Sequence, residues 1–256
     1  MPALSVFVAA RAAARWLPDS LESISRQALP EGWRLQIRLG IDACEETLAF
    51  AKGLRMPNLE VRFFPRHVGP FVIFNSLAQA TPSDVLVRFD ADDVMLEGYL
   101  SRQLAAVSDP AEARITHTWP ILVDEQLKPV SAELFNGGRS AADGKRSAPT
   151  DGQFLMTRPV LDKVGGFRPW WCHADSDFLL RALAFGCSRW IVPEHLYLRR
   201  IHPGSLTQSE STGYHSELRL GYARHFLEAK ARYLKGEPPE YIAPATAESI
   251  PVQVQG

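Results

Sequence analysis

Hydrophobic and polar positions follow two alternating periods along the first hundred residues. Strands are predicted at residues 4–8, 35–41, 59–63 and 85–89, and the apolar run 4–8 has the length typical of a strand buried on both faces. Segments with apolar residues at helical spacing separate these strands and begin near residues 17, 45 and 70. Repeated strand and helix units of this kind predict an α/β fold with a mostly parallel sheet, right-handed crossovers and helices on both faces. Ligands of such folds bind beyond the carboxyl ends of the strands.

The pattern changes after a helix that passes through Leu100 and Leu104. Residues 115–119 alternate like an exposed strand, and residues 136–152 lack periodicity and predict a surface loop. Helices are predicted at residues 159–164, 178–185 and 214–234, and strands near residues 190 and 197. The Pro-rich tail after Gly236 lacks the periodicity of a packed element. These changes divide the chain into residues 1–110, 111–210 and 211–256.

The charge balance and the cysteine content argue against several classes of protein. With 28 basic and 29 acidic side chains, the net charge of −1 gives no electrostatic reason to expect nucleic acid as a partner. The 3 cysteines lack CxxC spacing, so they predict neither a disulfide framework nor a zinc site and fit a reducing cytoplasm. No segment approaches the roughly 20 apolar residues of a membrane helix. We therefore expect a soluble, cytoplasmic protein.

Three aspartates follow the apolar run at 85–89, namely Asp90, Asp92 and Asp93. Residues i and i+2 of an extended segment face the same way, so Asp90 and Asp92 should direct two carboxylates to one point while Asp93 turns elsewhere. Two such oxygen ligands suit Mg²⁺ or Mn²⁺ with open positions for substrate phosphates. The structural alternative is an acidic turn that caps the next helix, because Asp favours such positions.

The run 86–95 resembles the strand and Asp-x-Asp segment of family 2 glycosyltransferases, enzymes with the GT-A fold. The turn 42–47, the run 66–69 and Asn75 precede this run, and they occur in the same order as in that family. The resemblance covers the first hundred residues. The chain departs from it at Ala9-Ala10-Arg11, where many members have Pro-Thr-Tyr.

This resemblance implies that residues 1–110 form a nucleotide-sugar-binding half. Asp42 would contact the nucleotide base, Asp90 the ribose or the metal, and Asp92 the metal that bridges the diphosphate. The implied donor-binding residues are Ala9, Arg11, Asp42, Arg66, Asp90, Ala91 and Arg200, and the implied metal ligands are Asp90, Asp92 and His202. Arg200 would balance the charge of the leaving group. The alternative for His202 is an ordinary surface or core histidine.

Residues 111–210 would then form the acceptor-binding and catalytic-base half. The segments 164–167 and 175–181 look like the acceptor-side segment of the family, and Asp175 stands where the general base stands. Ala174 replaces a Glu of the family pattern. The start of a helix favours an anion at this point, and Asp175 as the N-cap is an alternative compatible with that role. The implied acceptor contacts are Trp171, His173 and Asp177, with core packing as the alternative for a tryptophan.

The function implied is inverting transfer of a sugar from a nucleotide diphosphate sugar, UDP-linked by preference, to a hydroxyl of a glycan or lipid-linked acceptor. Mn²⁺ or Mg²⁺ would be the cofactor. One alternative is a catalytically inactive module that binds nucleotide sugar or glycan. Another is a phosphatase of the haloacid-dehalogenase-like class, which also carries Asp-x-Asp after a buried strand.

Residues 211–256 comprise the last predicted helix and the tail. Basic residues of this helix stand among aromatic and aliphatic ones, and they are Arg219, Arg224, Lys230, Arg232 and Lys235. This pattern indicates either peripheral contact with the inner face of a membrane, where lipid-linked acceptors reside, or a solvated face.

Overall fold

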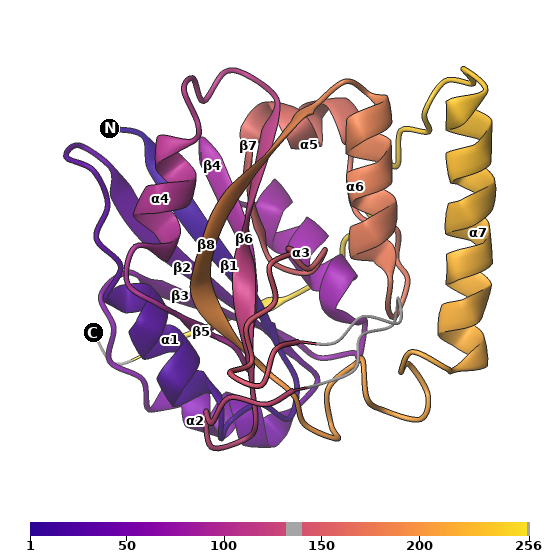
Figure 1. Ribbon diagram of the computed structural model, residues 1–256. Helices are drawn as coiled ribbons and strands as arrows, with labels where there is room; N and C mark the ends of the chain where they lie inside the picture. The colour runs from indigo at the N-terminus through magenta and orange to yellow at the C-terminus, as the bar shows by residue number, and fades with distance from the viewer. Residues whose placement is uncertain (132–139, 255–256) are drawn as a thin grey trace.

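The computed structural model describes residues 1–131 and 140–254 (Figure 1). Its strands are β1 (Ala3–Ala10), β2 (Arg34–Asp42), β3 (Leu59–Phe64), β4 (Val85–Asp90), β5 (Val94–Met95), β6 (Arg114–Val123), β7 (Phe154–Thr157), β8 (Ser188–Arg200) and β9 (Ile250–Val252). Its helices are α1 (Leu17–Ser25), α2 (Glu45–Lys52), α3 (Pro70–Gln79), α4 (Tyr99–Ala105), α5 (Arg158–Val164), α6 (Ala174–Ala184) and α7 (Glu217–Leu234).

The described strands form one sheet in the order β5-β8-β6-β7-β4-β1-β2-β3-β9. Strand β1 pairs in parallel with β2 and with β4, β2 pairs in parallel with β3, and β6 pairs in parallel with β8. The strands β5, β7 and β9 run antiparallel to their neighbours. The strand order reverses at β1, because β2 lies on one side of it and β4 on the other. The predicted α/β fold with a mostly parallel sheet is confirmed.

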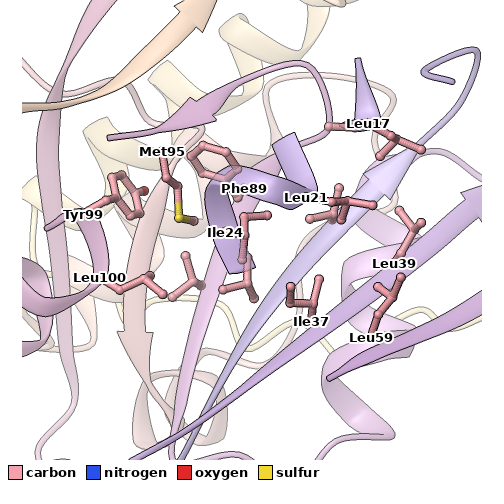
Figure 2. Close-up of a cluster of buried hydrophobic side chains, with 14 of the residues drawn as sticks. Leu17, Leu21, Ile24, Ile37, Leu39, Leu59, Phe89, Met95, Tyr99 and Leu100 are labelled. Atoms are coloured by element: carbon pink, nitrogen blue, oxygen red, sulfur yellow. The ribbon is translucent and has the colours of Figure 1, made fainter. Parts of the chain in front are cut away.

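Helices cover both faces of the sheet, and each face has its own apolar core. On one face α1 and α4 contribute Leu21 and Leu100, which Figure 2 labels, and α2 contributes Leu48 to the same cluster. On the other face α3 and α6 contribute Phe74 and Phe178. The strands between the two layers are buried on both sides. This explains why the sequences of β1 and β4 are nearly continuous apolar runs.

Helix α7 packs against α6 at one side of the molecule (Figure 1). It begins after Ser216, whose side chain accepts a hydrogen bond from the backbone N–H of Arg219 at 3.2 Å. An N-cap of this kind stabilises the first turn of a helix. Within the described ranges, no helix has the length and apolar character needed to cross a membrane.

Strand β6 is longer and more buried than its alternating pattern predicted. It lies between β8 and β7, and Ile115, Thr116 and His117 are each 0% exposed. The prediction of an exposed strand at 115–119 is therefore wrong, because neighbouring strands and helices cover its polar residues as well as its apolar ones. The two strands predicted near residues 190 and 197 are one strand, β8.

The tail after Gly236 is packed, contrary to the prediction. The N–H of Gly166 donates to the carbonyl of Ile242 at 2.7 Å, and the N–H of Ala247 donates to Oγ of Ser76 at 2.9 Å. Strand β9 then pairs with the edge strand β3. The partners of the tail come from distant parts of the chain, so the local periodicity does not reveal its packing.

The predicted loop 136–152 falls only partly within the described residues, because residues 136–139 lie outside them. Residues 140–152 contain no helix or strand, apart from one isolated bridge between Lys145 and Ile121. The end of this segment leads into β7, an unpredicted strand that places it beside β4.

Candidate functional site

A cavity of about 1140 Å³ opens beyond the carboxyl ends of β1, β2 and β4. Sheets whose strand order reverses bind their ligands at this position. The loop 146–153, the start of α6 and the segment after β8 form the rest of the wall. The predicted site residues that line the cavity are Ala9, Arg11, Asp42, Asp90, Ala91, Asp92, Trp171, His173, Asp175, Arg200 and His202. Both halves of the chain therefore contribute to one site.

The acidic cluster lies in a turn directly after β4. The strand ends at Asp90, and the N–H of Asp93 donates to the carbonyl of Asp90 at 3.4 Å. One carboxylate oxygen from each of Asp90, Asp92 and Asp93 lies within 4.8 Å of the others. The expectation that Asp93 turns elsewhere is wrong. The chain leaves the extended conformation after Asp90, so the alternation of side chains along a strand no longer applies.

Asp90, whose side chain is 37% exposed, and the buried Asp93 both have hydrogen-bond partners within the protein. Oδ1 of Asp90 lies 3.0 Å from Nη2 of Arg88, and Oδ2 of Asp90 accepts a hydrogen bond from Gln153 at 2.8 Å. Oδ2 of Asp93 accepts a second hydrogen bond from the same amide, and its Oδ1 accepts from the backbone N–H of Arg200 at 2.9 Å. The cluster is therefore attached both to the segment before β7 and to the end of β8.

The third member, Asp92, faces the segment after β8. Its Oδ2 lies 2.9 Å from Nε2 of His202. The imidazole is 7% exposed, and its Nδ1 has no hydrogen-bond partner in the part of the chain that the structure describes. The ring of Trp16 packs beside it at 5.2 Å between centroids.

Two carboxylates of the cluster, those of Asp90 and Asp93, have raised pKa values. Burial raises the pKa of Asp90 to about 6, with Arg88 opposing the shift and Asp92 adding to it. Burial, together with the neighbouring carboxylates, also raises the pKa of Asp93 well above its usual range. A divalent cation would relieve this crowding of like charges, and an all-carboxylate set of oxygen donors suits Mg²⁺ or Mn²⁺. The residues present therefore fit such an ion.

Asp175 lies in the first turn of α6, on the wall that faces the cluster. The N-cap position of the helix belongs to His173, so Asp175 is not the N-cap residue. Oδ1 of Asp175 accepts a hydrogen bond from the N–H of Ser176 at 2.9 Å. A Cβ atom at Gly152 would lie 3.5 Å from Oδ2 of Asp90 and 3.7 Å from Oδ2 of Asp175. Both carboxylates therefore lie close to Gly152, together with the guanidinium of Arg88.

Asp42, at the end of β2, holds the loop that begins α3. Its Oδ1 accepts from the N–H of Val68 and its Oδ2 from the N–H of Gly69, both at 2.9 Å. Nδ1 of His67 lies 2.8 Å from the same Oδ2. Nη1 of Arg11 donates to the backbone carbonyl of Asp42 at 3.1 Å. The carboxylate of Asp42 lines the cavity, but most of its hydrogen-bonding capacity is already used within the protein.

Trp171, which belongs to the half formed by residues 111–210, packs against this loop. Its ring lies 4.8 Å from the ring of His67, and a Cβ atom at Gly69 would lie 3.0 Å from it. The side chain is 38% exposed. His173 instead packs against Phe226 of α7, and burial lowers its pKa. Trp171 thus presents an aromatic face to the cavity, which core packing alone does not require.

Two predicted site residues do not line the cavity. Arg66 is exposed on the surface outside it. Asp177 is 0% exposed, with Oδ2 at 2.8 Å from Nε of Arg181 and Oδ1 at 3.0 Å from Nε of Arg168. A fully buried carboxylate with two guanidinium partners is a structural ion pair, so the arrangement gives no support to an acceptor contact by Asp177. Arg200 lines the cavity while its Nη2 pairs with Asp19 at 2.9 Å.

The structure adds site residues that the sequence did not indicate. They are Arg88, Asp151, Gly152, Gln153 and Arg199, all of which line the cavity. Gln153 and its neighbours follow an aperiodic segment, so no pattern marks them. Burial and the nearby Asp175 raise the pKa of Asp151, whose Oδ2 accepts a hydrogen bond from Oγ of Ser176 at 2.8 Å.

Residues 5–165 match the profile of the family described as glycosyl transferase family 2. The match spans more than half of the 256 residues, and the chain belongs to this family. A search of curated protein sequences found no match.

Several solved structures share the fold. Staphylococcus aureus TarS (residues 1–349) in complex with UDP-GlcNAc has a TM-score of 0.60 and 17% identity, over 80% of this chain and 60% of that one. Mannosyltransferase PcManGT from Pyrobaculum calidifontis in complex with GDP-Man and Mn²⁺ has a TM-score of 0.63 and 17% identity, over 94% of this chain and 67% of that one. GalNAc-T7 with UDP, GalNAc and Mn²⁺ has a TM-score of 0.62 and 15% identity, over 90% of this chain and 49% of that one. The fold is therefore that of the GT-A glycosyltransferases, and the chain spans 60% of the TarS fragment.

Proposed function

We propose that this chain is an inverting glycosyltransferase that moves a sugar from a nucleoside diphosphate sugar to an acceptor hydroxyl, with Mn²⁺ or Mg²⁺ as cofactor. The observation that carries the proposal is the meeting of Asp90, Asp92 and Asp175 in one cavity. The first two belong to the acidic turn of the family segment, and the third faces them across Gly152. Family membership supports the same activity.

Residues 1–110 bind the donor in this proposal. Arg11 and Asp42 border the part of the cavity beyond β1 and β2, where the base would lie, and Ala9 and Ala91 leave room beside it. Arg200 would face the diphosphate charge. We infer uridine as the nucleoside, because TarS and GalNAc-T7 bind UDP or its sugar. The GDP-Man complex of PcManGT makes guanosine the first competitor to test.

Residues 111–210 bind the acceptor and supply the base. The carboxylate of Asp175 accepts the proton of the acceptor hydroxyl while that oxygen bonds to the anomeric carbon and the bond to the diphosphate breaks. The attack comes from the face opposite the leaving group, so the anomeric configuration inverts. A divalent ion held by Asp90, Asp92 and His202 would stabilise the charge on the departing nucleoside diphosphate. Trp171 would stack on the acceptor sugar.

The decisive experiment measures nucleoside diphosphate release from UDP-linked and GDP-linked sugars, with saccharide acceptors, in Mn²⁺, Mg²⁺ or EDTA. We expect release that EDTA abolishes. Asp175→Asn should keep donor affinity and lower transfer about 10²- to 10⁴-fold, as expected for loss of a general base. The matched control Asp162→Asn alters an exposed aspartate of α5 and should leave transfer unchanged.

The outcomes separate the alternatives. Donor binding without any release of diphosphate would favour an inactive binding module. More than a tenth of wild-type transfer in Asp175→Asn would remove Asp175 from the role of base. The phosphatase alternative finds no support, because the chain belongs to a glycosyltransferase family.

For the acceptor we propose a glycan or lipid-linked saccharide, reached from a membrane surface on which α7 lies. Leu220, Leu227 and Leu234 recur at every seventh position and are 38%, 59% and 79% exposed. Basic residues of the helix, Arg224 and Lys230 among them, are exposed beside them. Sedimentation with anionic vesicles should carry down the wild-type chain but not Leu227→Glu/Leu234→Glu. Equal sedimentation of both proteins would dismiss the membrane contact.

A further inference from the structure

Gln153 connects two carboxylates of the acidic cluster, the half-buried Asp90 and the buried Asp93. Its Nε2 donates to Oδ2 of Asp90 at 2.8 Å and also to Oδ2 of Asp93. Gln153 is 2% exposed. Because both contacts run to the same Nε2, the amide presents its nitrogen to the two carboxylates and has both N–H groups committed. One side chain therefore contacts both Asp90 and Asp93.

A chain of hydrogen bonds holds the amide itself in place. Oγ1 of Thr150 donates to Oε1 of Gln153 at 2.9 Å and lies 2.7 Å from the hydroxyl of Tyr197. The single hydroxyl hydrogen of Thr150 is used toward Gln153, so Tyr197 is the donor to Thr150. Tyr197 is 0% exposed in the core, and successive donors in such a chain polarise and strengthen one another. These hydrogen bonds connect the amide of Gln153 to the buried core through Thr150 and Tyr197.

The neighbours of Gln153 connect the same segment to the opposite wall of the cavity. Asp151 binds the hydroxyl of Ser176, the residue after Asp175, at 2.8 Å. Gly152 lies against Asp90 and Asp175, where a Cβ atom would also come within 3.0 Å of Nη1 of Arg88. The segment 150–153 therefore contacts the acidic cluster on one side and the start of α6 on the other.

We propose that Gln153 is a positioning residue for the divalent metal site, whose amide, shared with Asp93, orients the metal ligand Asp90. The proposal rests on the metal dependence proposed above. Without this amide, Oδ2 of Asp90 loses the donor that fixes it, and the carboxylate is free to turn away from the site. Changes to groups that orient metal ligands typically cost about 10- to 100-fold in metal affinity.

The test is direct titration of the protein with Mn²⁺, monitored by the electron paramagnetic resonance signal of the free ion, in the presence and absence of UDP. Gln153→Met keeps the volume and removes the hydrogen bonds, and we expect it to weaken Mn²⁺ binding by about 10- to 100-fold. Gln153→Asn keeps an amide that is one methylene too short to reach both carboxylates. It should weaken binding in the same direction, and it serves as the second variant if Gln153→Met does not fold.

Gln103 provides the matched control, because it is also a buried glutamine, 0% exposed, whose Nε2 donates to the carbonyl of Tyr99 at 3.3 Å. It does not line the cavity. Gln103→Met should lower the midpoint of urea unfolding and leave Mn²⁺ affinity unchanged. Wild-type Mn²⁺ affinity in the Gln153 variants would overturn this inference alone. A wild-type chain that binds neither Mn²⁺ nor Mg²⁺ would overturn the proposed metal dependence as well, so the two failures are distinct.

Discussion

Nε2 of His202 lies 2.9 Å from Oδ2 of Asp92, although 110 positions separate the two residues in the sequence. The contact connects the turn after β4 with the segment after β8. It brings a nitrogen donor to the acidic cluster, and the ring is held from the side by Trp16. A ring in this position either binds a divalent ion at Asp92 or orients that carboxylate.

Replacement of His202 should therefore weaken metal binding. We expect His202→Ala to lower Mn²⁺ affinity about 10-fold or more, whether the ring is a ligand or orients Asp92. Isothermal titration calorimetry with Mn²⁺ measures this change. The control is His225→Ala, since His225 packs on Trp170 outside the cavity. Equal losses of Mn²⁺ affinity in the two variants would show that the loss comes from reduced stability of the fold and not from the metal site.

Trp171 should contribute to acceptor affinity. We expect Trp171→Ala to raise the KM for the acceptor about 3- to 10-fold, because aromatic packing contributes about 0.5 to 1.5 kcal/mol. The KM for the donor should change less. Trp190 is 58% exposed and does not line the cavity, so Trp190→Ala is the matched control in the same steady-state assay. An unchanged acceptor KM in Trp171→Ala would leave the ring without this role.

The ion pair of Asp177 with Arg181 should support stability and not acceptor binding. Both side chains are 0% exposed, and removal of one partner leaves a buried charge without compensation. We expect Asp177→Ala to lower the free energy of unfolding by about 3 to 5 kcal/mol, as measured by urea titration. Glu237→Gln removes an exposed partner of Arg232 and should have little effect. An intact unfolding midpoint with a raised acceptor KM in Asp177→Ala would restore Asp177 to the acceptor site.

His117 should make the fold sensitive to acid. Burial lowers its pKa to about 3, with Arg189 adding to the shift and the backbone of Thr150 and Gln153 opposing it. An unfolded histidine takes up a proton below about pH 6.5, whereas the folded one does so only near pH 3. The contribution of neutral His117 to the free energy of unfolding is therefore complete above pH 6.5 and is lost as the pH falls toward 3.

Between pH 7.5 and 5.5 the predicted loss from His117 alone is roughly 1.4 kcal/mol. Urea unfolding of the wild type and of His117→Leu at both pH values measures it, because the leucine cannot titrate. The change in unfolding free energy between the two pH values should be smaller, by about that amount, in His117→Leu than in the wild type. The same pH dependence in both proteins would show that His117 does not cause it.

The tail should be needed for a stable fold. Truncation after Gly236 removes the hydrogen bonds of Ile242 and Ala247 and the pairing of β9 with β3. We expect a loss of at least about 2 kcal/mol in unfolding free energy, since several net hydrogen bonds disappear. Glu248→Ala changes an exposed position of the tail and is the control. A truncated chain with unchanged thermal unfolding would show that the tail only lies on the surface.

Elements that bury whole faces were predictable from the sequence. The runs around Val6 and Val87 become the central strands β1 and β4, because a strand covered on both sides needs apolar residues without interruption. The position of Asp90 and Asp92 at the carboxyl end of β4 followed from the same reasoning. The periodicity of a segment is sufficient to predict such elements, because it shows which faces of the strand or helix are buried.

Tertiary structure alone decided which side chains meet. The turn after Asp90 brings Asp93 into the acidic cluster, and Gln153 reaches the cluster from an aperiodic segment that leads into β7. Asp177 lies one helical turn from Arg181 and is covered by the core, although its type and position suggested an exposed site residue. The physical reason is that these contacts depend on how loops return to the sheet. Loops carry no period, and their partners are distant in the sequence.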